Sequence, residues 1–271
     1  MTEKNTRNSL FIVLGVAIVY TFVKILGSDF FKEIYIFGLV LSFLYFWIPG
    51  GVALAYSKRE GKPLPIFAKP NRTYWLIPLL TLVTFLVASF ATLPFRETVP
   101  TFSFFEGKTL WMQIGSGILF FFLNYVLMTF IFSFLFLGSE LYWRGYLWDR
   151  LKEMGPWKAM TITAILWSVW QIPLTALSLF SNSTMVLRNA IIVIVISFVF
   201  TPLLTFFRVR CKSVYAAALC YSSFLAAFTF SIALFHFGSM REMGILGGWF
   251  LIVTALEVLA LKFIGSKRKE K

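Results

Sequence analysis

Long apolar runs recur along the chain and are separated by short polar segments. As a helix, a run of about 20 such residues crosses a hydrocarbon core of about 30 Å. A spanning segment must be helical because the bilayer offers no water to unpaired backbone groups. The pattern therefore predicts about eight transmembrane helices. They fall at residues 9–27, 34–56, 74–95, 113–138, 158–180, 185–207, 213–236 and 244–264.

The composition agrees with this pattern. Of the 271 residues, 59% are hydrophobic, 19% are aromatic and only 14% are charged, whereas about a quarter of a soluble domain is charged. We predict an all-α, polytopic integral membrane protein with a single membrane domain over residues 1–271. The first apolar run has no small-residue cleavage site, so we expect it to be retained. The proline-containing polar segment 57–75 is expected to be an extended loop.

Basic residues predict the orientation, because loops that stay in the cytoplasm keep an excess of Lys and Arg. Most of the 25 Lys and Arg residues lie at the two ends of the chain or in the second, fourth and sixth predicted loops, Arg144 included. Both termini are therefore expected in the cytoplasm. The membrane would be the cell membrane of a prokaryote or the endoplasmic reticulum of a eukaryote.

The formal net charge of +13 is spread over these short loops. Attraction to anionic lipid headgroups explains it better than binding to nucleic acid, which we do not expect. The one histidine, His236, cannot by itself build a histidine zinc site or a Ser-His triad. We expect no metal and no cofactor. Glu257, in the last apolar run, has three possible partners, or it faces a cavity; the three are Lys24, Lys262 and Asn124.

The most distinctive polar feature is the pair Glu140 and Arg144, which follows the fourth apolar run. The spacing of four residues brings both side chains to one face of a helix. Charges at the edge of a membrane are costly and generally face protein or a water-filled cavity. Two interpretations follow from the residues alone: a structural ion pair that closes the helix, or a catalytic site.

The residues around this pair resemble the first motif of the CAAX protease and bacteriocin-processing family, also called the Abi family, of eight-helix intramembrane endopeptidases. That motif is Glu-Glu-x-x-x-Arg, often continued as Trp-Arg-Gly-Tyr-Leu. Ser139, Glu140, Trp143 and Arg144 occupy it here and are followed by Gly-Tyr-Leu. The first Glu of the family is therefore Ser139.

The second and third motifs also resemble that family. The second is commonly Trp-x-x-Trp-His-x-Pro, and "WSVWQIP" keeps both Trp residues and the Pro but has Gln171 in place of His. The third is His-x-x-x-Asn, and the best alignment places Tyr221 and Leu225 at these two positions. The motif-bearing core is about residues 113–236. Pro173 interrupts the apolar run 158–180 and is expected to bend the helix there. Together with the resemblance, this bend predicts a cavity lined by Trp143, Trp167, Trp170 and Pro173.

In active relatives, the first Glu and the first His are understood to activate water, and the second His and the Asn to stabilise the oxyanion. A base must accept a proton near neutral pH, and an oxyanion needs preorganised donors. Ser139 and Gln171 cannot act as bases, and Leu225 cannot donate a hydrogen bond. The resemblance thus implies a catalytically degenerate intramembrane protease homologue.

We expect this homologue to bind a hydrophobic or prenylated peptide, or a partner membrane protein. Two alternatives remain open. One is an active CAAX-type endopeptidase that uses Glu140 as its base. The other is a membrane transporter or channel, which only the proline breaks inside the apolar runs favour.

Overall fold

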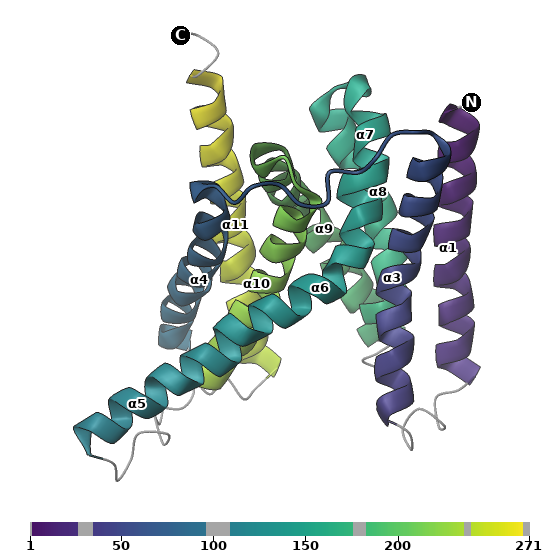
Figure 1. Ribbon diagram of the computed structural model, residues 1–271. Helices are drawn as coiled ribbons and strands as arrows, with labels where there is room; N and C mark the ends of the chain where they lie inside the picture. Colours follow the sequence, from purple (N-terminus) through teal and green to yellow (C-terminus); the bar gives the residue numbers. More distant parts are fainter. Residues whose placement is uncertain (1, 27–34, 96–108, 176–182, 236–239, 268–271) are drawn as a thin grey trace. The chain divides into compact units, whose positions relative to one another are not determined.

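The computed structural model describes residues 2–26, 35–95, 109–175, 183–235 and 240–267, and within these ranges the regular structure is entirely helical (Figure 1). This confirms the all-α prediction. The helices before the motif region are α1 Thr2–Leu26, α3 Tyr35–Arg59, α4 Arg72–Thr92 and the short η1 Leu93–Phe95. The region of the first motif contains α5 Leu110–Phe121, η3 Phe122–Leu127, α6 Met128–Glu140, η4 Leu141–Leu147, α7 Trp148–Leu151 and η5 Lys152–Met154. It is followed by α8 Pro156–Thr175, α9 Ser183–Cys211, α10 Val214–Phe235 and α11 Met240–Lys267.

Within the described residues, 7 helical stretches are long and apolar enough to cross a membrane. They are Glu3–Val23, Val40–Arg59, Arg72–Phe95, Leu110–Met154, Leu187–Cys211, Val214–Phe235 and Arg241–Ala260. The remaining predicted run, 158–180, extends beyond the described residues, and its described part is α8. The chain is therefore an integral membrane protein with a helix count close to the one predicted.

The fourth helix does not end at residue 138 as predicted. Its helical path continues through the polar motif to Met154, and the stretch Leu110–Met154 contains 45 residues. Arg144, predicted to lie in a cytoplasmic loop, is a fully buried part of this stretch. The predicted helix end is wrong because Glu140 and Arg144 form an ion pair inside the protein. These charges therefore do not require the helix to end in water.

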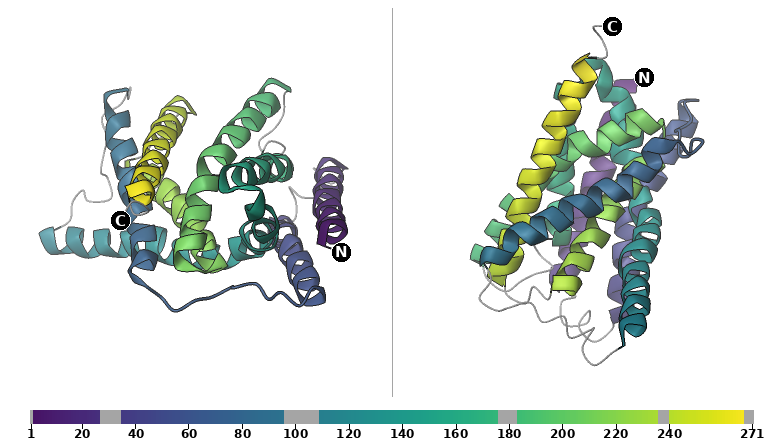
Figure 2. Two further views of the ribbon diagram at one scale, coloured as in Figure 1. Left: turned by 90° about the horizontal axis from the view of Figure 1, so that it is seen from above. Right: turned by 90° about the vertical axis from the view of Figure 1, so that its left-hand side faces the viewer.

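The helices form two compact units, and the first consists of Met1–Lys69 and Phe134–Ala218. Within it, α1 lies beside α3 and α8, and α8 lies beside α9 (Figures 1 and 2). Helices α3 and α6 touch through glycines: a Cβ added to Gly50 would lie 2.6 Å from the carbonyl oxygen of Gly138. Small residues of this kind allow helix backbones to approach closely in a membrane.

The loop after α3 is extended over residues 62–71, as the prolines predicted. The carbonyl oxygens of Pro65 and Ile66 accept hydrogen bonds from the backbone N–H groups of Val214 and Tyr215, at 2.9 and 3.0 Å. These N–H groups belong to the first turn of α10. The N–H groups of a first turn have no hydrogen-bond acceptor inside their own helix. The loop therefore caps α10.

The second unit consists of Pro70–Ser133 and Leu219–Lys271, and in it α4 lies beside α11 (Figures 1 and 2). Phe85 of α4 stacks on Phe250 of α11, with ring centroids 4.3 Å apart, and Phe224 packs edge-on against Phe250. Aromatic pairs in these geometries add to the energy of apolar burial.

Glu257 of α11 accepts a hydrogen bond from the hydroxyl of Thr84 on α4, at 2.5 Å. Asn124, one of the predicted partners, donates to the carbonyl oxygen of Phe120 in its own helical stretch. The side chains of Lys24 and Lys262, the other two, lie outside the described residues. A hydroxyl on a neighbouring helix thus joins α4 to α11 within the second unit.

Candidate functional site

The first motif lies on a π-helical segment in the interior of the first unit. All residues of η4, Leu141–Leu147, are buried, and the preceding Ser139 and Glu140 are 0% exposed. A π-helical turn shifts the backbone register of a helix and is frequent at functional sites. The motif is therefore a part of the core and not a loop at the membrane surface.

Glu140 and Arg144 form the ion pair that their spacing predicted. Arg144 Nη1 donates to Glu140 Oε1 at 3.0 Å, and both side chains are 0% exposed. Arg144 Nη2 donates to the hydroxyl of Thr201 on α9 at 3.1 Å. The guanidinium also lies over the ring of Trp167, 4.1 Å from its centroid. The pair does not close a helix end; it joins η4 to α8 and α9.

The backbone of the motif is also held. Arg208 of α9 donates from Nε to the carbonyl oxygen of Arg144 at 3.1 Å, and its Nη2 lies 3.6 Å from Asp149 Oδ2. Arg208 was predicted as a loop residue, but it is 7% exposed and belongs to α9. A charged donor on α9 thus binds the backbone of the π-helical segment.

The predicted aromatic residues are buried close together in the same unit. Trp143 and Trp170 are 0% exposed, with ring centroids 5.9 Å apart, and Trp167 is 1% exposed. Tyr45 of α3 stacks on Trp170 at 4.7 Å, and its hydroxyl donates to the carbonyl oxygen of Trp170. Pro173 is buried farther along α8. A cavity lined by these residues remains a prediction. No pattern in the sequence indicated Tyr45.

Two of the predicted motif positions, Ser139 and Gln171, lie in the first unit. The hydroxyl of Ser139 donates to the carbonyl oxygen of Phe136 at 3.0 Å, within its own helix. Gln171 is 4% exposed on α8, directly after Trp170. Ser139 and Glu140 are consecutive on α6, so the first motif presents one carboxylate and one hydroxyl.

The third-motif positions lie on the part of α10 that belongs to the second unit. Tyr221 and Leu225 are both partly exposed there, one helical turn apart. Among the side chains that the structure describes, no three from His, Cys, Asp and Glu gather to hold a metal. His236 lies outside the described residues.

The first unit thus contains both the buried Glu140–Arg144 pair and the Trp–Trp–Gln–Pro run of α8. Residues 115–227 match the type II CAAX prenyl endopeptidase Rce1-like family. The match confirms the resemblance seen in the motifs, and it includes Glu140, Gln171 and Tyr221. Over these residues, this membrane protein is similar to the CAAX-type proteases. No curated protein matches it.

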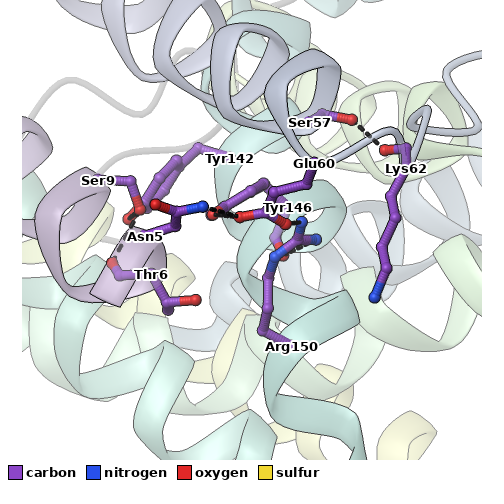
Figure 3. Close-up of polar contacts among 9 residues, drawn as sticks. All are labelled: Asn5, Thr6, Ser9, Ser57, Glu60, Lys62, Tyr142, Tyr146 and Arg150. Carbon is purple, nitrogen blue, oxygen red and sulfur yellow. Dashed lines mark hydrogen bonds and ion pairs between the residues drawn. The ribbon is translucent and has the colours of Figure 1, made fainter. Parts of the chain in front are cut away.

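The Rce1-like segment also takes part in a polar cluster that the sequence did not predict (Figure 3). Its centre is Glu60, which follows the last residue of α3. Glu60 Oε1 accepts hydrogen bonds from Asn5 Nδ2 of α1 at 3.1 Å and from the hydroxyl of Tyr146 at 2.9 Å. Its Oε2 forms an ion pair with Arg150 of α7, whose guanidinium covers the Tyr146 ring at 3.7 Å.

A second contact joins the same helices. The hydroxyls of Ser9 on α1 and Tyr142 on η4 lie 3.2 Å apart (Figure 3). Burial alone would raise the pKa of Glu60, but the hydrogen bonds from Arg150, Tyr146 and Asn5 outweigh it and hold the pKa below its usual value. Glu60 is therefore a carboxylate at neutral pH and ties α1 and α3 to the Rce1-like segment.

Proposed function

We propose that this protein is a catalytically degenerate relative of the CAAX endopeptidases, which binds a hydrophobic peptide segment without cleaving it. The observation that carries this proposal is the state of Glu140. The only carboxylate of the first motif is ion-paired with Arg144, inside the protein, with both side chains fully buried. A carboxylate neutralised in this way is a poor general base.

The neighbouring positions support the same conclusion. The hydroxyl of Ser139 donates its hydrogen bond to the carbonyl oxygen of Phe136. Gln171 is an amide that cannot take up a proton at neutral pH. Loss of one general base typically costs about 10²–10⁴ in rate. Loss of an oxyanion-hole donor costs a further factor of about 10²–10³.

The retained frame favours a binding role. Trp143, Trp167 and Trp170 remain buried, and Trp167 lies against the Arg144 guanidinium, although the chemistry that they would serve is missing. Burying a charged side chain in a membrane protein costs free energy, so a buried charge indicates a functional role. A hydrophobic segment, either prenylated or part of a partner's membrane helix, is the ligand class that fits a relative of the CAAX endopeptidases.

The test uses the full chain in lipid nanodiscs, with a fluorescent prenylated peptide and its unprenylated counterpart. Fluorescence anisotropy measures binding, and mass spectrometry of the peptide detects cleavage. We expect saturable binding and an intact peptide. A wild type that cleaves the peptide, and loses this activity on Glu140→Ala while staying folded, would overturn the proposal.

One observation favours a second candidate, an active endopeptidase that uses Glu140. Within the described residues, Glu140 Oε2 is buried and has no hydrogen-bond partner. This oxygen could accept a proton from water. The candidate predicts measurable turnover by the wild type, and the double variant Ser139→Glu/Gln171→His should raise it. The same double change in an Arg144→Met background serves as the control, because it lacks the cation of the motif.

We also propose that both termini lie in the cytoplasm, either of a prokaryotic cell or at the endoplasmic reticulum. The support is the excess of Lys and Arg in the terminal segments and alternate loops. Reporters that are active on only one side of the membrane, fused in turn to each terminus, test this orientation. Opposite signals from the two ends would refute it.

A further inference from the structure

A small polar pocket lies in the first unit between the loop after α3 and the α7–η5 turn. Its volume is about 210 Å³, and its lining residues are Lys62, Pro63, Asp149, Arg150, Lys152 and Glu153. A water molecule takes about 30 Å³ in the liquid, so the pocket holds a group of several heavy atoms. It is separate from the buried Glu140–Arg144 pair.

Two candidate membrane spans end beside this pocket. The candidate span that includes α3 ends at Arg59, three residues before Lys62. The long span that contains the motif ends at Met154, directly after Glu153. Phospholipid headgroups occupy the region just outside the hydrocarbon core. We therefore infer that the pocket lies at the depth of lipid phosphates.

Most charges in the pocket already have partners. Arg150 is paired with Glu60. Lys152 Nζ lies 2.9 Å from Asp149 Oδ1, and Arg208 approaches the other oxygen of the same carboxylate. In the part of the chain that the structure describes, the charged groups of Lys62 and Glu153 take part in no ion pair or hydrogen bond. One cation and one carboxylate thus remain for a ligand.

Both of these residues stand on a fixed backbone. Gly61 has φ +67°, a left-handed conformation that ends α3. Lys62 then donates its N–H to the carbonyl oxygen of Ser57 at 3.1 Å and accepts from the Ser57 hydroxyl (Figure 3). Glu153 is held in the short turn η5, Lys152–Met154. A ligand can therefore bind the charged groups of Lys62 and Glu153 without first ordering the backbone of the loop.

We propose that this pocket binds a zwitterionic phosphoethanolamine group, with its phosphate on Lys62 and its ammonium on Glu153. A purely anionic group would meet the carboxylates of Glu153 and Asp149. A trimethylammonium group has no N–H to donate to Glu153, so choline is the poorer match. The inference does not depend on whether the protein cleaves peptides.

The experiment uses native mass spectrometry of the full-length protein, released from nanodiscs that contain phosphatidylcholine with either phosphatidylethanolamine or phosphatidylglycerol. We expect selective retention of phosphatidylethanolamine. Lys62→Gln and Glu153→Gln should each reduce retention roughly threefold to tenfold, because each removes one charged contact made by an exposed side chain. Lys58→Gln is the matched control, since Lys58 is exposed nearby but does not line the pocket.

Free phosphoethanolamine, added as a competitor, distinguishes the two sources of the ligand. Failure to displace the lipid at millimolar concentration indicates a lipid site, and full displacement indicates a site for the soluble compound; both support the proposed chemistry. Equal retention of all three lipids, or retention that Lys62→Gln and Glu153→Gln leave unchanged, would overturn it. Thermal unfolding of each variant confirms that the protein is folded.

Discussion

Two Glu–Arg pairs involve the same long helical stretch, and they differ in almost every respect. The inner pair, Glu140–Arg144, lies four residues apart on one helix, and both side chains are 0% exposed. The outer pair, Glu60–Arg150, joins residues 90 positions apart, and its side chains are 6% and 11% exposed. One is local in sequence and deep in the protein, while the other is distant in sequence and near the surface.

The difference shows that the two pairs have different structural roles. The inner pair takes two charges fully out of water, and the attraction between them mainly compensates for that cost. Its contacts with Thr201 and Trp167 fix the motif against neighbouring helices. The outer pair loses less hydration and connects α1, α3 and α7 through one carboxylate. We therefore expect the inner pair to be intolerant of single changes and the outer pair to be more forgiving.

The largest effect is expected from Arg144→Met, because it leaves Glu140 as a buried charge without its cation. We expect the free energy of unfolding to fall by about 3–5 kcal/mol. The double variant Glu140→Gln/Arg144→Met should recover a large part of this loss. Unfolding of the detergent-solubilised protein, followed by circular dichroism, measures both. Equal losses in the single and double variants would show that packing, and not charge, governs the inner pair.

A second test concerns the packing that precedes the inner pair. A Cβ at Gly138 would lie 2.7 Å from the carbonyl oxygen of Phe46 and 2.8 Å from Cα of Trp47. Gly138→Ala should therefore lower the free energy of unfolding by about 1–3 kcal/mol. Gly51→Ala is the control, since nothing lies within 4 Å of its added Cβ. If both variants unfold alike, the close approach of α3 and α6 does not support the motif.

The outer pair should give a smaller loss. Glu60→Gln keeps the shape of the side chain but removes its charge, and we expect a decrease of about 1–2 kcal/mol in the free energy of unfolding. A double-mutant cycle with Arg150→Met isolates the interaction between the two side chains. A coupling energy as large as that of the inner pair would erase the distinction between them.

The smallest effect is a pH dependence that belongs to Glu60. Its pKa is lower in the folded protein than in the unfolded chain, whose Glu has a pKa of about 4.3. The stabilisation is therefore complete above that pH and is lost as the pH falls through the lowered value. The stability difference between wild type and Glu60→Gln, measured from neutral to acidic pH, should shrink only at the acidic end. A constant difference would contradict this assignment.

The contrast between the pairs also shows what the sequence could predict. The inner pair follows from a spacing of four residues, and the apolar runs were enough to predict the helices. The predicted end of the fourth helix is wrong because its polar residues pair inside the protein and do not contact water. The partners of Arg144, namely Thr201, Trp167 and the donor Arg208, come from helices distant in sequence, and no local pattern indicates them.

The outer pair was missed for the same reason. Glu60 is the one acidic residue in the basic segment 57–75, which is a weak signal in the sequence. Its role becomes visible only in the structure, where it forms an ion pair with Arg150. Thr84 as the partner of Glu257 was equally hidden, because hydroxyls are common in apolar helices. Motif similarity singled out Gln171 and Tyr221, but no local pattern indicates what these two positions do.

The continuous helical stretch Leu110–Met154 has a mechanical consequence. One crossing of a hydrocarbon core of about 30 Å takes about 20 helical residues, and this stretch has 45. A helical segment that is longer than the local hydrocarbon thickness is accommodated by tilting, by kinking or by thickening of the bilayer. Because Glu140 and Arg144 lie within this stretch, lipid chain length becomes a variable that acts on the surroundings of the motif.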